Sequence, residues 1–224
     1  VKLARKLQID IAIDLGGHTK DARTGIFSYR AAPIQVNYLG YPGSLGAEYI
    51  DYLIADKTII PMSSQQYYSE KIAYLPNTYM VDDSKRVAAQ THLEKSEFNL
   101  PDTGFIFCCF NNSYKITPDT FQSWMRILEK VENSVLWLSE NNVFLRNNLR
   151  NEASKKGIEL DRIIFAEKVA DPRIHLARHK LADLFLDTRP YNAHTTALDA
   201  LKSGLPVLTL MGESFASRVA GSLP

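Results

Sequence analysis

The chain has 224 residues, of which 45% are hydrophobic and 23% charged, and its formal net charge is +1. This length suffices for one large domain or two modest ones, and the composition is that of a globular protein. A net charge so close to zero excludes a broad electrostatic attraction to nucleic acid, so an anionic ligand would have to be held by local groups.

The sequence predicts neither a membrane segment nor a disulfide. No apolar stretch approaches the roughly 20 residues that a membrane helix needs, and no signal segment is recognisable. Cys108 and Cys109 are adjacent in an apolar run, where a packed strand is more typical than a bridge or a metal site. We therefore expect a soluble, cytoplasmic protein without membrane or nucleic-acid partners. Because Val1 is not a start methionine and Pro224 follows a helical-looking segment, we also expect a piece of a longer protein.

Short apolar or alternating runs bounded by turn residues predict strands along the whole chain. In chain order they cover residues 9–15, 34–39, 52–55, 105–110, 135–138, 163–165, 184–186 and 207–210. In the second half they alternate with helical patterns, the clearest of which puts Phe121, Trp124, Met125 and Leu128 on one face. This alternation predicts an α/β fold with a parallel sheet.

The sequence also indicates helix boundaries and a domain junction. Thr117 and Asp171 each stand before a proline and are suited to cap a helix start, whereas Gly204 marks a helix end. The polar segment 81–104 has little periodicity apart from a helix expected near 87–95. We place the domain junction in that segment.

The strongest local signal is a strand, loop, helix and strand unit in the last fifth of the chain. A strand ending at Leu186 leads through a loop to a helix that begins near Thr195. Ligands of parallel sheets gather at the carboxyl ends of strands, and a helix N-terminus favours a phosphate, so His194, Thr195 and Thr196 are candidates for binding one. Alternatively, Thr196 and Asp199 form only a capping box and His194 is an ordinary loop residue.

Two further candidates follow other strands. Parallel connectivity places Lys115, after the strand 105–110, at the same sheet edge as His194, where it would neutralise a diphosphate leaving group. His175 and Arg178 share one helix face and would frame a nucleobase by stacking and hydrogen bonding. The alternatives are a solvated loop lysine and a solvated helix face.

Two glycine-containing segments, 14–19 and 39–46, follow strands in the first half of the chain. Their glycines either supply positive φ angles for tight turns or let the backbone approach a ligand closely. Neither segment has the G-x-G-x-x-G spacing of a dinucleotide site.

Seven segments in this order carry a resemblance to a known family: 9–19, 32–36, 39–43, 68–71, 114–116, 192–196 and 217–220. Together they resemble the catalytic region of the protein O-linked N-acetylglucosamine transferases, particularly bacterial homologues attached to helical (TPR) repeats. The resemblance implies a GT-B fold of two Rossmann-like lobes. Residues 1–80 would belong to an incomplete first lobe, 81–104 to a linker, and 105–224 to the lobe that binds the nucleotide sugar.

The resemblance also implies an activity. The parent enzyme would move N-acetylglucosamine from UDP-GlcNAc to Ser or Thr hydroxyls of proteins, by an inverting mechanism that needs neither metal nor cofactor. Lys115 and His194 would be catalytic. Lys115 would contact the diphosphate, His194, Thr195 and Thr196 the diphosphate and the sugar end, and Asp199 the ribose.

The remaining donor contacts come from other segments. By the same resemblance, His175 and Arg178 would flank the uracil, and Leu39 and Gly40 would line the sugar pocket. Asn112 would add a weaker or water-mediated contact, because many family members have the longer glutamine there. The family's histidine-bearing segment early in the first lobe is expected upstream of Val1.

Two alternative functions remain open from the sequence. The first is a related transferase with another donor, such as GDP-fucose in plant Spindly-type relatives, or UDP-glucose. His194-Thr195-Thr196, followed by Ser217-Arg218, favours the N-acetylglucosamine branch. The second is a non-catalytic nucleotide-binding module.

Overall fold

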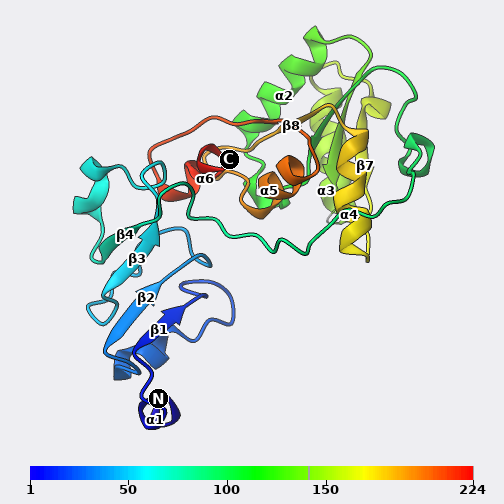
Figure 1. The fold of residues 1–224 in the computed structure, drawn as a ribbon. Coiled ribbons are helices and arrows are strands. Elements are labelled where there is room, and N and C mark those ends of the chain that lie inside the picture. The colour runs from blue at the N-terminus through cyan, green and yellow to red at the C-terminus, as the bar shows by residue number, and fades with distance from the viewer. Residues whose placement is uncertain (141, 224) are drawn as a thin grey trace. The chain divides into compact units, whose positions relative to one another are not determined.

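The chain folds into two compact units in a computed structural model that describes residues 1–140 and 142–223. Val1–Val81 with Glu213–Pro224 form the first unit, and Asp82–Gly212 form the second. Each unit is built on its own parallel sheet (Figure 1). The sequence assigned residues 213–224 to the second lobe, whereas the structure groups them with the first unit.

The first unit has a four-stranded sheet in the order β1-β2-β3-β4, with all neighbouring strands parallel. Its strands are β1 (Ile11–Asp14), β2 (Ile34–Asn37), β3 (Tyr52–Ala55) and β4 (Lys71–Tyr74). Its helices are short: α1 (Lys2–Lys6), η1 (Thr24–Tyr29), η2 (Met62–Tyr67), η7 (Phe215–Ser217) and α6 (Val219–Ser222). Phe215 and Val219 pack into a core cluster with Leu53 and Ile59, which explains why the last segment belongs to this unit.

The second unit has a five-stranded parallel sheet in the order β7-β6-β5-β8-β9. Its strands are β5 (Phe105–Cys109), β6 (Ser134–Ser139), β7 (Ile163–Ala166), β8 (Leu184–Leu186) and β9 (Val207–Leu208). Its α-helices are α2 (Pro118–Lys130), α3 (Val143–Ser154), α4 (Pro172–Arg178) and α5 (Thr195–Lys202). Short η turns cover Lys95–Phe98, Ser113–Lys115 (η4), Leu160–Arg162 and His179–Leu181 (η6).

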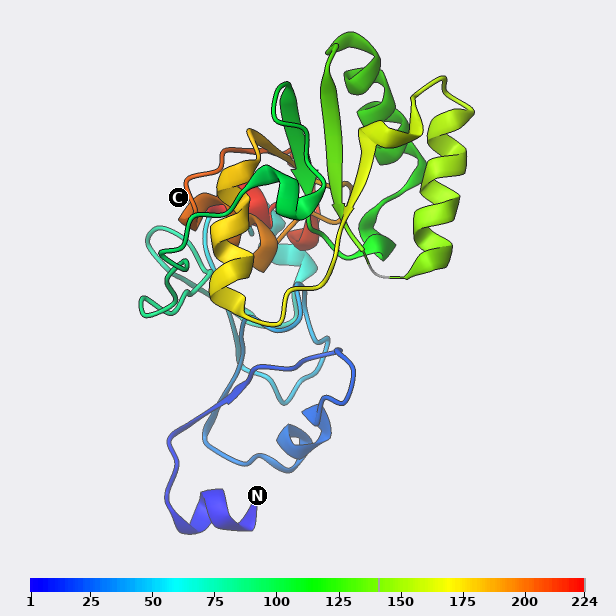
Figure 2. The ribbon, with the colours of Figure 1, turned by 90° about the vertical axis from the view of Figure 1, so that its right-hand side faces the viewer.

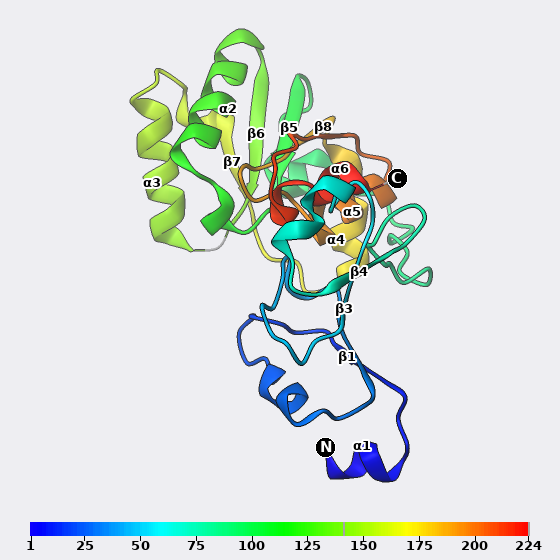
Figure 3. The same ribbon diagram turned by 90° about the vertical axis from the view of Figure 1, so that its left-hand side faces the viewer.

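The strand order of the second unit creates a switch point. From β5 the chain moves outward through β6 to β7, then returns to the other side of β5 to form β8 and β9. Accordingly, α2 and α3 cover one face of the sheet and α4 and α5 the other (Figures 2 and 3). The loops after β5 and β8 therefore diverge from neighbouring strands at the carboxyl edge, where ligands of open parallel sheets bind.

Most predicted elements are confirmed, and one is wrong. All eight predicted strands are present, and both predicted caps form: the Thr117 hydroxyl and the Asp171 carboxylate accept backbone N–H bonds at the starts of α2 and α4. The helix expected near 87–95 does not form. There Val87 is 59% exposed, and the Ala89 N–H donates to the Arg173 carbonyl at 3.0 Å, so this donor is satisfied by α4 and not within a helix of its own.

The adjacent cysteines lie in the central strand β5, as predicted. Both side chains are fully buried and unbridged, and burial raises the pKa of each thiol. None of the helices formed by residues 1–140 and 142–223 is long and apolar enough to cross a membrane.

Both glycine explanations apply in the first unit. Gly17 has a φ of +58° and serves a tight turn, in which the Asp14 carboxylate accepts its N–H at 3.0 Å. Gly40 instead allows close approach, because a Cβ there would lie 1.9 Å from the carbonyl oxygen of Leu15.

Replacing Gly40 tests this packing. We expect Gly40→Ala to lower the free energy of unfolding by about 1–3 kcal/mol, because the new methyl group must displace the backbone after β1. Gly25→Ala is the matched control, since nothing lies within 4 Å of a Cβ at Gly25. Thermal melts of both variants give the measurement, and equal melting temperatures would contradict the close approach.

Candidate functional site

Lys115 joins the loops that follow β5 and β8. It ends η4 and is only 8% exposed. Its Nζ donates a 2.7 Å hydrogen bond to the carbonyl of Asn192 and lies 4.0 Å from the centre of the Tyr191 ring. The sequence predicted that Lys115 and the His194 region share one sheet edge, and the structure brings them together. The alternative of a solvated loop lysine is wrong.

Asn111 also links these loops. It lies just after β5, with 1% of its surface exposed. Its Nδ2 donates to the hydroxyl of Thr188 at 2.7 Å, and its Oδ1 accepts from the hydroxyl of Thr196. Thr196 therefore does not use its hydroxyl in a capping box with Asp199. This alternative is also wrong.

Asp187 is the centre of this polar cluster. Its carboxylate accepts hydrogen bonds from the Ala193 N–H at 2.6 Å, the Thr188 N–H at 2.7 Å and the Thr209 hydroxyl at 2.6 Å. Asn111 Nδ2 adds a fourth at 3.2 Å. The carboxylate thus ties the end of β8 to the loops after β5 and β9.

Burial shifts the pKa values of Lys115 and Asp187 in this cluster. It lowers the pKa of Lys115 to about 8, and the negative charge of Asp187 opposes that shift. Burial also raises the pKa of Asp187, against the hydrogen bonds that favour its ionised form. At pH 7 the site therefore holds a largely protonated amine that is poorly solvated, and an anion that reaches it would replace the missing water.

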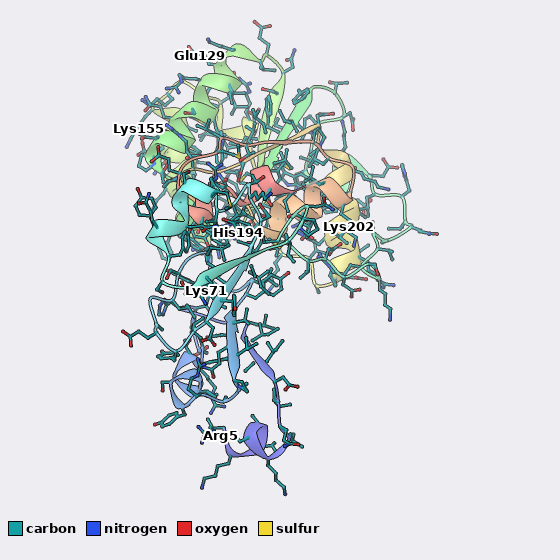
Figure 4. All side chains as sticks on the ribbon, turned by 60° about the vertical axis from the view of Figure 1, so that its left-hand side comes forward. Arg5, Lys71, Glu129, Lys155, His194 and Lys202 are labelled. Atoms are coloured by element: carbon teal, nitrogen blue, oxygen red, sulfur yellow. The ribbon has the colours of Figure 1, made fainter. Side chains whose placement is uncertain are left out.

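The helix α5 begins at the same place. His194 is its N-cap and stacks on Tyr191, with ring centroids 5.0 Å apart (Figure 4 marks His194, and Lys202 in the last turn of the helix). Thr195 is exposed and Thr196 partly so. The positive end of the α5 dipole and the Lys115 ammonium are thus held by one loop, an arrangement suited to an anion.

His175 and Arg178 form a neighbouring cluster on α4. Arg178 is 3% exposed, its guanidinium lies 4.5 Å from the Phe110 ring centre, and it donates to Nδ1 of His175 at 2.7 Å. The solvated-face alternative is therefore wrong for Arg178. Burial, followed by the positive charge of Arg178, lowers the pKa of His175 to about 3, which leaves a neutral ring with its proton on Nε2.

Asp199 lies on α5 near His175, with 3.9 Å between Oδ2 of Asp199 and Nε2 of His175. Its other oxygen accepts a hydrogen bond from Arg86, which also pairs with Asp82 at 3.1 Å. Lys202 binds the second oxygen of Asp82. These ion pairs thus hold the segment 82–86 against α5.

The other predicted contacts lie elsewhere. Asn112 is exposed at the N-cap position of η4, next to the buried Asn111. Leu39 and Gly40 belong to the first unit, where Leu39 has a φ of +70° and packs against the core. The structure does not bring Leu39 and Gly40 together with the Lys115 cluster within one compact unit.

Sequence reasoning missed four residues of this site: Asn111, Asp187, Tyr191 and Arg86. Asn111 and Asp187 each stand directly after a predicted strand, and that position is the signal that could have found them. Nothing in the sequence around Arg86 indicated its role, because its partner Asp199 lies far along the chain, on α5.

The comparison with known families identifies the chain. Residues 3–96 and 87–223 match the family described as glycosyl transferase family 41. The chain belongs to glycosyl transferase family 41. The predicted α/β fold of GT-B type, with two parallel-strand sheets, is likewise confirmed: the chain superposes on a mutant of the Thermobaculum terrenum O-GlcNAc transferase with a TM-score of 0.86 and 29% identity, over 99% of this chain and 42% of that one.

Two family 41 relatives are plant proteins. The probable UDP-N-acetylglucosamine–peptide N-acetylglucosaminyltransferase SEC of Arabidopsis thaliana is 42% identical over 99% of this chain and 23% of its own length. The probable enzyme of the same type named SPINDLY, from Eustoma exaltatum, is 33% identical over 99% of this chain and 24% of its own length. The chain spans about a quarter of the length of these curated relatives.

Asn111 and Asn112 form a natural test pair. We expect Asn111→Ala to lower the free energy of unfolding by about 1–3 kcal/mol, because the buried hydroxyls and carboxylate around it lose their partner. Asn112→Ala, at an exposed position, should change it by less than about 0.5 kcal/mol. Urea titrations of both variants would measure this, and equal midpoints would show that the join between the loops adds no stability.

Proposed function

We propose that the protein containing this chain transfers N-acetylglucosamine from UDP-GlcNAc to Ser or Thr hydroxyls of proteins. The observation that carries the proposal is the buried Lys115 ammonium, hydrogen-bonded to the loop that starts α5. Membership of family 41 and the names of SEC and the Thermobaculum enzyme support the same reaction.

The proposed chemistry is stabilisation of a leaving diphosphate. As the bond between the sugar and the phosphate breaks, negative charge grows on the UDP oxygens. Lys115 and the N-terminus of α5, with the hydroxyls of Thr195 and Thr196, would supply fixed positive charge and donors there. This is the role that a metal ion fills in other enzymes, and on this ground we propose a metal-independent, inverting transfer without a cofactor.

His194 would add a contact at the sugar end of the diphosphate. Its position as N-cap of α5, stacked on Tyr191, holds the ring beside the helix start. Because Tyr191 also contacts the Lys115 ammonium, the two proposed catalytic side chains share one aromatic support.

The nucleoside end would bind along α4 and α5. The neutral ring of His175 would stack on uracil. The buried Arg178 guanidinium, which is hydrogen-bonded to Nδ1 of His175, would hold the orientation of that ring. Asp199 would accept a ribose hydroxyl through Oδ2, since Arg86 occupies Oδ1. In the first unit, Leu39 and Gly40 would line the sugar pocket.

Two accompanying proposals concern the donor and the location. Both SEC and SPINDLY are named as probable UDP-N-acetylglucosamine–peptide transferases, which supports the N-acetylglucosamine donor over the fucose donor. A cytoplasmic location is supported by two adjacent thiols that stay unbridged in the core.

Calorimetric titration with UDP tests the phosphate role. We expect Lys115→Met to weaken UDP binding by about tenfold to a hundredfold, because one charge-assisted hydrogen bond is lost. Lys130→Met, at an exposed position at the end of α2, should bind as the wild type does. Unchanged affinity in Lys115→Met would remove the proposed role, and tighter binding of GDP than of UDP would favour the fucose alternative.

The pH dependence of UDP binding gives an independent test. Lys115 is protonated below its pKa of about 8 and loses its charge above it. Affinity should therefore be constant from pH 7 to about 8 and then fall, by at most tenfold per pH unit, since the phosphates are already ionised. The Lys115→Met variant should lack this decline, and a decline of the same size in both proteins would assign it to another group.

A further inference from the structure

The start of the second unit carries a row of alternating charges that leads onto α5. Arg86 donates to Oδ1 of Asp199 and pairs with Asp82, whose second oxygen binds Lys202 (labelled in Figure 4). All four residues belong to the second unit, which begins at Asp82. The sequence assigned residues 81–104 to a linker, and these contacts place the first residues of that segment beside the proposed ribose site.

The backbone before Arg86 is folded so that this side chain is held in place. The Asp83 carboxylate accepts the Lys85 N–H at 2.8 Å, and the Asp83 carbonyl accepts the Arg86 N–H at 3.0 Å, so the chain makes a tight turn there. The same carbonyl accepts a bond from Nζ of Lys202 at 2.9 Å. The turn is therefore tied to the last turn of α5 through its backbone as well as through a carboxylate.

The exposure of these ion pairs shows what they contribute. The Asp199 side chain is 11% exposed, whereas those of Arg86 and Asp82 are 35% and 22% exposed. Ion pairs that reach the solvent add little to the free energy of unfolding. The contribution of this network is therefore the place and orientation that it gives to the nearly buried carboxylate.

Arg86 decides which oxygen of Asp199 a ligand can use. The guanidinium occupies Oδ1, and this bond restricts rotation of the carboxylate. Oδ2 lies 3.9 Å from Nε2 of His175, which is too far for a hydrogen bond. Oδ2 is thus the oxygen left for a hydroxyl of the ligand, and it lies beside the ring that would stack on uracil.

The charge of Arg86 also suits this carboxylate to a nucleotide. An ionised carboxylate accepts hydrogen bonds and donates none, so it recognises the hydroxyls of a sugar. An unpaired carboxylate would also repel the phosphates of the same ligand, and a guanidinium beside it offsets that repulsion. The pair therefore keeps the acceptor for the ribose and reduces its electrostatic cost.

We propose that Arg86, supported by Asp82, is a positioning residue that presents Oδ2 of Asp199 to the ribose. Through this contact the protein would prefer nucleotides with ribose hydroxyls over nucleotides that lack them. The proposal rests on the proposed binding of UDP and on the contact between Asp199 and the ribose. It extends them by giving the first residues of the segment 81–104 a part in donor recognition.

The test is calorimetric titration with UDP and with 2′,3′-dideoxyuridine diphosphate, which has the same base and charge but neither ribose hydroxyl. The wild type should bind UDP about tenfold more tightly, as for one hydrogen bond to a charged group. Arg86→Met should weaken UDP binding about fivefold and dideoxy-UDP binding by less than about twofold, because only the ribose contact is lost.

Two further variants separate positioning from charge. Arg146→Met is the matched control, because Arg146 is 37% exposed in the same unit and pairs with Glu140 at 3.2 Å. It should keep both affinities and, like Arg86→Met, the wild-type melting temperature. Asp82→Asn leaves Arg86 without its support and should reduce the preference for UDP in part. A pure charge effect has the opposite sign, because loss of a negative charge strengthens the binding of both nucleotides.

The outcomes also separate this proposal from the proposed function. Equal weakening of the two nucleotides in Arg86→Met, or a full preference for UDP in that variant, would overturn the positioning role and leave the proposed function standing. If the wild type itself binds both nucleotides equally, the ribose contact is wrong and the positioning role falls with it. The diphosphate role of Lys115 does not depend on either result, since Lys115→Met tests it separately.

Discussion

The site depends on hydrogen bonds between buried polar side chains of two loops. These loops follow the neighbouring strands β5 and β8 and then diverge. Asn111 follows β5, Asp187 follows β8, and the two side chains are hydrogen-bonded to each other and to the segment that starts α5. These bonds add to the one between Lys115 and the Asn192 carbonyl in fixing where Lys115 lies relative to the start of α5. The parallel sheet places the loops side by side, and these buried side chains hold them together.

This arrangement has an energetic cost. A buried amine is less stable in its charged form than an exposed one, and here the Asn192 carbonyl, the Tyr191 ring and the field of Asp187 compensate for lost water. Burial raises the pKa of Asp187, and four hydrogen-bond donors oppose that shift. The negative charge of Asp187 favours the charged form of Lys115, and packing alone gives no reason for keeping these two polar groups buried.

The sequence predicted the scaffold better than the side-chain network. Strand runs and the caps at Thr117 and Asp171 are local signals, and parallel connectivity then placed Lys115 near His194. The short edge strand β4, with only partly buried side chains after Lys71, lacked such a signal. The burial of Arg178 and the bond between Arg86 and Asp199 depend on residues that only the folded chain brings close. For the same reason, nothing local indicated that Phe215 and Val219 complete the core of the first unit.

The two buried cysteines of β5 have a practical consequence. Thiol reagents attack the ionised sulfur, and both sulfurs are fully covered and held in the protonated form. These are the only cysteines in the sequence, so the native fold has no reactive thiol of its own. A cysteine introduced on the surface would thus be the sole point of attachment for a dye, a spin label or a cross-linker.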